Sequence, residues 1–333
     1  MHRKNSSSDK ISALIIKLSL HDSLKALESL LISMSKRSKR SKEEKKNIVS
    51  FSQFQNWYIC PNRWWLDYPK GLRAFTDSIH TVFGTAIHDT IQLYLKTLYK
   101  KGEEQAEKIN LKKYFKFAFN REIKDKKIKV SDKEYTEFYF NGEDILKDFT
   151  KTKNRLKYFP LEKYELLDIE GEITVDIMNN VKILAYLDLV LKNKENDRIR
   201  IVDFKTSGQG WTVYQKEDYA KFSQVLVYKA VYSKKYDVPL SKIDVEFFIL
   251  KRKLYENVAW PQDRIQIFIP KNDAKEVQKS IYHFSTFVKE CFNADGSYNQ
   301  NAKHPKIPGK NRKNCKYCPH LKVNCDGLAD PIS

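Results

Sequence analysis

The sequence has no apolar run that approaches the roughly 18–20 residues needed for a membrane-spanning helix, and its mean hydropathy is −0.61. No short apolar segment with a small-residue cleavage site follows the start, so we expect a cytoplasmic protein that is not secreted and has no membrane partner. The five cysteines are then expected to be thiols or metal ligands, not disulfides. The pattern G-x4-G-K-S/T is absent, so the chain has no recognisable ATP motor.

Positive charge is in excess. The 61 Lys and Arg residues outnumber the 42 Asp and Glu residues and give a formal net charge of +19. Such a balance favours a polyanionic partner. Hydrophobic residues make up 41% and aromatic residues 13% of the chain, which is enough for a folded core and excludes wholesale disorder.

Composition and periodicity divide the chain into five parts. Residues 1–35 contain one helix-period segment, which we expect to dock on a partner or on the chain itself, and residues 36–49 have the composition of a basic linker. A helical region is predicted over 50–160 and an α/β core over 161–293. Residues 294–333 form a basic tail that contains three cysteines.

The core is predicted to contain a mixed sheet. Strand patterns over 165–177, 181–191 and 198–205, with the polar turn sequence 193–197 between the last two, predict a hairpin. A helix over 218–236 and a strand over 243–250 follow, which makes a βαβ crossover with parallel strands. A long amphipathic helix over 271–292 completes the core.

The hairpin places two acids together. If its turn is centred between Glu195 and Asn196, Asp188 lies directly opposite Asp203. Two neighbouring carboxylates call for a raised pKa or a bound divalent cation. Lys205 lies two residues beyond Asp203 and therefore on the same side of the strand. The alternative is a buried Asp–Lys ion pair that serves structure only.

Two predicted helices add polar groups to this hairpin. His88, on the helix that begins at Gly84, is a candidate third metal ligand, with Gln92 one turn further on. Gln224 and Tyr228 are four residues apart on the helix after the hairpin, so they share a face and can point together toward the carboxylates or a substrate phosphate.

The tail carries a second metal-binding pattern. Cys315, Cys318 and Cys325 follow the spacing Cys-x2-Cys-x6-Cys, in which two thiolates can hold one metal from a tight turn. A fourth ligand is needed. Zinc remains open as the metal, with His304 or His320 in place of a cysteine. The leftover Cys291 is predicted to be a buried apolar residue.

The same tail is a candidate nucleic-acid contact. No acidic residue occurs between Lys303 and Lys322, and the basic residues there favour a phosphate backbone, in particular Lys310, Arg312, Lys313 and Lys316. Five aromatic residues over 57–68 could stack on bases, but core packing is the expected role for most of them. Nothing in the sequence indicates that bases are read. We therefore expect the chain to bind DNA without a preference for particular base sequences.

Six motifs occur together in an order that resembles the PD-(D/E)XK nuclease superfamily. They are Ser50-Phe51-Ser52 with Cys60-Pro61, Gly84 to His88, Asp188, Ile201 to Ser207, Gln224 to Tyr228, and the three tail cysteines. More narrowly, the chain is similar to the RecB-like iron–sulfur branch, which includes the AddB nuclease domain, CRISPR-adaptation nucleases and related phage exonucleases.

The resemblance implies a fold and a set of ligands. The fold would be α/β, a restriction-endonuclease-like mixed sheet flanked by helices, with a cysteine-ligated cluster that clasps its N- and C-terminal parts. The implied ligands of Mg²⁺ or Mn²⁺ are His88, Asp188, Asp203 and the carbonyl of Phe204. Lys205, Gln224 and Tyr228 would be catalytic, and a 4Fe-4S cluster would bind Cys60, Cys315, Cys318 and Cys325. The family commonly has Gly where this chain has Ala185.

The expected function is therefore a metal-dependent deoxyribonuclease, an exonuclease that acts on single strands or DNA ends. Its setting would be DNA repair, recombination or phage DNA processing in the cytoplasm of a bacterial or phage-infected cell, with a helicase or recombination protein as a partner. Two other classes stay open: a catalytically inactive DNA-binding subunit of the same fold, and a redox or structural protein built on the metal cluster.

Overall fold

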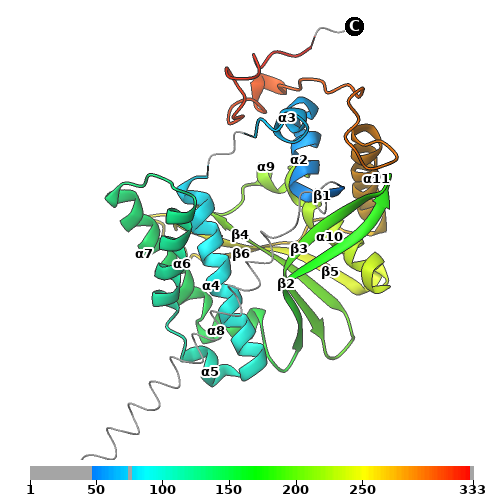
Figure 1. Cartoon of the computed structure of the whole chain (residues 1–333). Helices are drawn as coiled ribbons and strands as arrows, with labels where there is room; N and C mark the ends of the chain where they lie inside the picture. The colour runs from blue at the N-terminus through cyan, green and yellow to red at the C-terminus, as the bar shows by residue number, and fades with distance from the viewer. Residues whose placement is uncertain (1–46, 74–76, 331–333) are drawn as a thin grey trace, which may run out of the picture.

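Figure 1 shows a computed structural model of the chain, which describes residues 47–73 and 77–330. The predicted helical segment 1–35 and residues 36–46 of the predicted linker lie outside the described residues. Within the described part, no helix combines the length and apolar character that a bilayer crossing demands.

A six-stranded mixed sheet forms the centre of the molecule. Antiparallel pairing joins β2 (Tyr164–Met178) to β3 (Val181–Asn193), and β3 to β4 (Ile199–Ser207). β4 pairs in parallel with β5 (Ile243–Lys251), and β6 (Ile265–Phe268) pairs antiparallel with β5. Helix α10 (Tyr219–Tyr236) connects the parallel pair. The predicted hairpin, crossover and mixed sheet are confirmed.

Strand β3 has one neighbour, β2, on one side and two successive neighbours, β1 (Ile48–Ser50) and then β4, on its other side. β2 pairs with β3 along one side from Val181 to Asn193. On the other side, β1 runs parallel to Lys182–Leu184, whereas β4 pairs with Leu189–Lys192. The stretch 185–188 therefore lies where β3 leaves one neighbour and meets the next. Asp188 is the last residue before the β4 ladder begins.

Helices cover both faces of the sheet (Figure 1). One face packs against α2 (Phe51–Ile59), α3 (Pro61–Asp67), α10 and α11 (Ala274–Cys291), and we call this core the α10-side cluster. The other packs against α4 (Ile79–Lys101), α6 (Leu111–Asp125) and α7 (Asp132–Phe149), and we call this core the α4-side cluster. Shorter elements are α5 (Glu103–Glu107), α8 (Thr152–Tyr158), α9 (Val213–Lys216), η1 (Leu240–Lys242) and η2 (Lys310–Arg312).

Local sequence explains how α4, the helix that carries His88, is positioned. The Ser78 hydroxyl accepts from the N–H of Thr81, and the Thr81 hydroxyl accepts in return from the N–H of Ser78. This reciprocal capping box fixes the first turn. One turn further, a Cβ added to Gly84 would lie 3.2 Å from Thr206 Oγ1 on β4. Glycine thus allows α4 to approach the sheet closely beside the end of β4.

The side chains of β3 exchange faces near Asp188. Leu187 belongs to the α10-side cluster and Leu189 to the α4-side cluster. Residues two apart on a regular strand share a face, so the strand turns over between them. On the facing strand β2, Glu170 has a φ of 56°. Glu170 and Asp188 are also missing from the ladder, which pairs Ile169 with Leu189 and Gly171 with Leu187, so both strands are irregular at this level.

The tail folds back onto the start of the folded unit (Figure 1). The side-chain amide of Asn314 donates to the carbonyl of Ile59 at 3.2 Å. His320 Nε2 lies 3.0 Å from Asp67 Oδ1, and this histidine is fully buried. These contacts join segments about 250 residues apart and close the chain between α2–α3 and the tail.

Candidate active site

Asp188 is held by the backbone of β4. The N–H of Phe204 donates to Asp188 Oδ2 at 2.8 Å, just beyond the last ladder pair, Leu189 with Val202. The four ladder pairs of β3 and β4 have the register that the turn predicted. One step beyond the last pair, the same register sets Asp188 opposite Asp203. A side-chain oxygen thus takes the place of a ladder carbonyl and brings the acid to the β4 strand.

Asp203 and Lys205 form the closest charged pair of the site. Asp203 is only 3% exposed, and Lys205 Nζ lies 2.6 Å from its Oδ2. Burial raises the pKa of Asp203 to about 6, against the attraction of Lys205 and with a further upward contribution from Asp188. Burial lowers the pKa of Lys205, but the two carboxylates outweigh it and the pKa is raised overall. The lysine therefore stays protonated beside an acid whose ionised form is disfavoured by burial.

His88 approaches Asp188 from α4. Its Nδ1 lies 3.7 Å from Asp188 Oδ2, and the imidazole is about one-fifth exposed. The structure therefore brings His88, Asp188, Asp203 and Lys205 into one place, from α4, β3 and β4. These are four of the residues named from the sequence.

Gln224 and Tyr228 share a face of α10, as their spacing predicts. The Gln224 side-chain amide donates to the Tyr228 hydroxyl at 2.8 Å. Tyr228 is buried in the α10-side cluster, which covers the face of the sheet opposite α4. Their predicted action on the substrate remains a prediction.

Asp188 and Asp203 have the chemistry to bind Mg²⁺ or Mn²⁺, although the side chains around them are not arranged as a complete set of ligands. Among residues 47–73 and 77–330, no three His, Cys, Asp or Glu side chains form a ready metal-binding group as placed. The chemistry nevertheless fits, because burial and the nearby carboxylate of Asp188 still raise the pKa of Asp203 although Lys205 lies 2.6 Å from its Oδ2, and a cation held by both acids would relieve their repulsion. Carboxylate oxygens are the preferred protein ligands of Mg²⁺ and Mn²⁺. The pair of acids is therefore a plausible anchor for such an ion.

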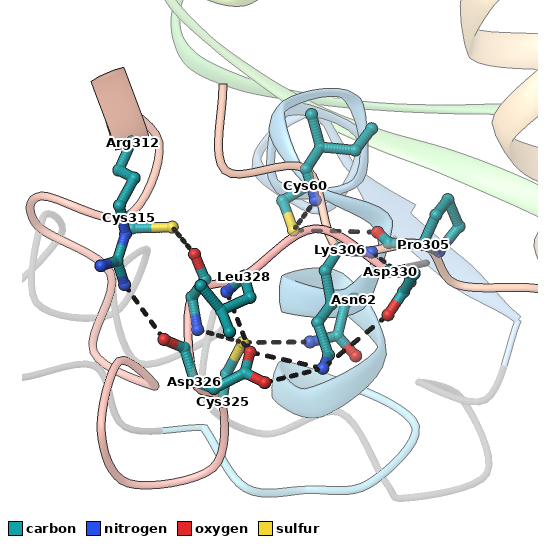
Figure 2. Close-up of polar contacts among 12 residues, drawn as sticks. Cys60, Asn62, Pro305, Lys306, Arg312, Cys315, Cys325, Asp326, Leu328 and Asp330 are labelled. Atoms are coloured by element: carbon teal, nitrogen blue, oxygen red, sulfur yellow. Dashed lines mark hydrogen bonds and ion pairs between the residues drawn. The ribbon is translucent and has the colours of Figure 1, made fainter. Parts of the chain in front are cut away.

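Four cysteines converge at a second place. Cys60 precedes α3, and it lines one small cavity with Cys315, Cys318 and Cys325 of the tail. Backbone N–H groups donate to two of the sulfurs, from Ile307 to Cys60 and from Gly327 to Cys325, each at 3.4 Å. Figure 2 shows the tail wrapped around the start of α3, with Lys306 paired to Asp326 and Asp330.

Cys291, His320 and His304 have surroundings that differ from one another. Cys291 is 1% exposed in the α10-side cluster, which confirms the buried role predicted for it. His320 uses both ring nitrogens, one with Asp67 and one with Asn324, so it is not available to replace a cysteine. His304 stacks on Trp65 with ring centroids 4.3 Å apart. The sequence did not single out the Asp67–His320 contact.

The basic tail and the aromatic cluster can be compared with their predicted roles. The side chains of Lys310, Arg312, Lys313 and Lys316 are all exposed, although Arg312 also donates to the carbonyl of Asp326 at 3.0 Å. Trp64 is fully buried, and the other aromatics over 57–68 pack partly buried against the α10-side cluster. The expected core packing of the aromatics is confirmed.

A mixed sheet that carries an Asp on one strand and an Asp-x-Lys sequence on the next, where β3 exchanges β1 for β4, is the arrangement of a nuclease fold. The family model for the PD-(D/E)XK nuclease superfamily matches residues 48–325, and the chain belongs to that superfamily. Its members generally use divalent metals such as Mg²⁺ or Mn²⁺.

Two solved structures show distant likeness to the chain. A candidate exonuclease from Eubacterium rectale is 12% identical, covers 75% of this chain and 82% of its own, and superposes with a TM-score of 0.45. The protein SSO0001 is 13% identical, covers 95% of this chain and 98% of its own, and superposes with a TM-score of 0.35. No curated protein sequence matches the chain significantly.

Proposed function

We propose that the chain is a divalent-metal-dependent deoxyribonuclease that acts as an exonuclease on single strands or DNA ends. The observation that carries the proposal is the buried Asp203, 2.6 Å from Lys205 and beside an Asp188 that is fixed to the same strand. Membership of a nuclease superfamily and a net charge of +19 support it.

Each residue has a role that follows from its chemistry. His88, Asp188, Asp203 and the carbonyl of Phe204 would hold Mg²⁺ or Mn²⁺, which supplies Lewis acidity and lowers the pKa of a bound water. Lys205 adds a fixed positive charge where the phosphate becomes more negative in the transition state. Gln224 and Tyr228 would support the site from α10.

The test is cleavage of labelled DNA. We expect single-stranded and duplex DNA with free ends to be degraded in Mg²⁺ or Mn²⁺ and left intact in EDTA, and circular single strands to resist. Asp203→Asn should abolish cleavage, whereas Asp176→Asn, at an acid whose side chain is 79% exposed on β2, should not. A folded wild-type protein that leaves every DNA intact in Mn²⁺ refutes the proposal, and retained binding would then identify the inactive DNA-binding subunit.

We also propose that Cys60, Cys315, Cys318 and Cys325 bind a 4Fe-4S cluster, with zinc as the alternative. The shared cavity and the N–H groups directed at two sulfurs support this. Iron and acid-labile sulfide measured on anaerobically purified protein should reach cluster stoichiometry. Zinc without sulfide contradicts the cluster.

A role in DNA repair, recombination or phage DNA processing follows from the same proposal. Because the sequence contains no recognisable ATP motor, unwound strands would come from a helicase or recombination protein, from frayed ends, or from a substrate that is already single-stranded. Degradation of blunt duplexes that is slow alone and accelerated by an added helicase is the expected result. Equal rates with and without the helicase contradict this dependence.

A further inference from the structure

An exposed tyrosine stands on a short helix soon after the strand that carries Asp203 and Lys205. Tyr214 of α9 is 85% exposed, and its neighbour Val213 is 65% exposed. Single exposed apolar side chains are common on protein surfaces, so exposure alone indicates no function. Tyr214 differs from such residues in how firmly its helix is held and in where that helix lies, after the end of β4 (Figure 1).

The segment that leads from β4 into α9 is fixed to strand β6. The Gln266 side chain of β6 accepts from the N–H of Trp211 at 2.7 Å and donates to the carbonyl of Trp211 at 3.3 Å. Gly210 has a φ of 99°, and an added Cβ would lie 3.0 Å from Gln266 Oε1, so glycine permits this close approach. Thr212 and Gln215 then form a reciprocal capping box at the start of α9. The helix that displays Tyr214 is therefore held in a defined position.

This segment lies on the same face of the sheet as Lys205. The Trp211 and Phe247 rings pack with centroids 4.8 Å apart, and Lys205 Nζ lies 5.8 Å from the centroid of the same Phe247 ring. Phe247 belongs to the α10-side cluster, and Trp211 packs against that cluster. One aromatic ring therefore links the base of α9 to the lysine of the candidate active site.

Further exposed aromatic side chains gather at this edge of the sheet. β4 and β5 are parallel and end together, and the N–H of Arg252, just after β5, donates to the carbonyl of Ser207 at 2.7 Å. The loop that follows β5 carries Tyr255, which is 54% exposed, and Trp260, which is 63% exposed. Exposed rings beside a site for phosphate chemistry suit an unpaired nucleic-acid strand, because every base has a face on which a ring can stack.

We propose that Tyr214 stacks on an unpaired base of the DNA strand whose phosphate is cleaved at Lys205. This inference rests on the proposed nuclease function and names the form of its substrate, a single-stranded end. Bases inside a duplex are already stacked on both faces, so the ring favours unpaired DNA. DNA is the expected occupant, not a protein, because the ring stands near Lys205 in a chain with a net charge of +19. Tyr214 is then a substrate-binding residue.

Binding and cleavage of a short oligothymidylate test this role. In EDTA, by fluorescence anisotropy, Tyr214→Ala should bind about 5- to 150-fold more weakly than the wild type, the effect of losing one stacked base. Tyr214→Phe keeps the ring and should bind like the wild type. The control Tyr282→Ala removes a tyrosine of α11 that is 69% exposed and should also bind like the wild type. In Mn²⁺, Tyr214→Ala should raise KM and leave kcat nearly unchanged, because the base is stacked both before and during cleavage.

A photochemical crosslink locates the contact. Near-ultraviolet light joins a 5-iodouracil base to an aromatic ring stacked on it, and mass spectrometry of the wild type crosslinked to a singly substituted oligothymidylate should find the bond at Tyr214. Wild-type affinity in Tyr214→Ala, weakened binding in Tyr214→Phe, or no crosslink at Tyr214 overturns the inference. If the wild type still cuts DNA, such a result leaves the proposed function standing. A wild type that crosslinks through Tyr214 but cuts nothing in Mn²⁺ overturns the proposed function and not the stacking.

Discussion

Replacing Asp203 with Asn should stabilise the metal-free protein while it abolishes cleavage. The acid is 3% exposed, and burial raises its pKa from 3.8 to about 6 despite the ion pair with Lys205. A raised pKa means that the folded state disfavours the ionised carboxylate. If Asp203 served only structure, through its ion pair, the same substitution would destabilise the protein.

The size and sign of the effect follow from linkage. A rise of about two pH units corresponds to roughly 3 kcal/mol at about 1.36 kcal/mol per unit. This cost is absent below pH 3.8, develops as pH rises through the interval to about 6, and is complete above it. Asn cannot ionise and so avoids this cost, but it leaves Lys205 with a weaker partner. We therefore expect the free energy of unfolding at pH 7 to rise by about 1–2 kcal/mol in Asp203→Asn.

Denaturant unfolding in EDTA at several pH values measures this gain. The difference between Asp203→Asn and the wild type should shrink as pH falls toward 4. Asp176→Asn, at an exposed acid that pairs with Lys182 at 3.5 Å, should change stability by less than about 0.5 kcal/mol. An Asp203→Asn protein less stable than the wild type at pH 7 would refute the reasoning and favour the structural ion pair.

Four further outcomes are expected. Lys205→Met should lower the cleavage rate roughly 100- to 1,000-fold with little change in single-strand affinity by fluorescence anisotropy; an equal loss of affinity argues against a transition-state role. Asp67→Asn should cost about 1–3 kcal/mol in thermal unfolding and expose the tail to protease; unchanged proteolysis contradicts the tail contact. Cys291, whose thiol pKa burial raises, should resist iodoacetamide in the native protein; rapid labelling contradicts its burial. Replacing Lys313 and Lys316 with Gln should reduce the slope of log Kd against log salt by about 1 to 1.5 for single strands; an unchanged slope removes both from the DNA contact.

The hairpin at the centre of the candidate site could be predicted from the sequence by the position of its turn and the alternation of side chains along its strands. The polar turn over 193–197 fixes the β3–β4 register, and that register, with strand alternation, brings Asp203, Lys205 and Asp188 together. Helical spacing likewise explains the Gln224–Tyr228 bond. In each case the interacting residues are close in sequence or joined by one turn, so geometry leaves few alternatives.

Contacts between distant segments could not be derived in this way. Alternation predicts that Leu187 and Leu189 share a face, yet they lie in opposite clusters because β3 turns over where it exchanges β1 for β4. Neither the short β1 nor the Asp67–His320 pair leaves a periodic signal, since each depends on a chain closure of more than 100 residues. The contact between Glu170 and Gln92 is hidden for the same reason, because Gln92 is on a distant helix.

The break in the sheet and the position of the acids have a common cause. A strand that leaves its neighbour exposes backbone N–H groups, and a buried N–H requires an acceptor. At the end of the β3–β4 ladder the acceptor for the N–H of Phe204 is the carboxylate of Asp188, not a carbonyl. The interrupted ladder therefore orients Asp188, and the residue after Phe204 is Lys205, which pairs with Asp203. The interruption that would weaken an ordinary sheet here fixes a charged group inside the sheet, where β3 passes from β1 to β4 and where His88 of α4 lies 3.7 Å away.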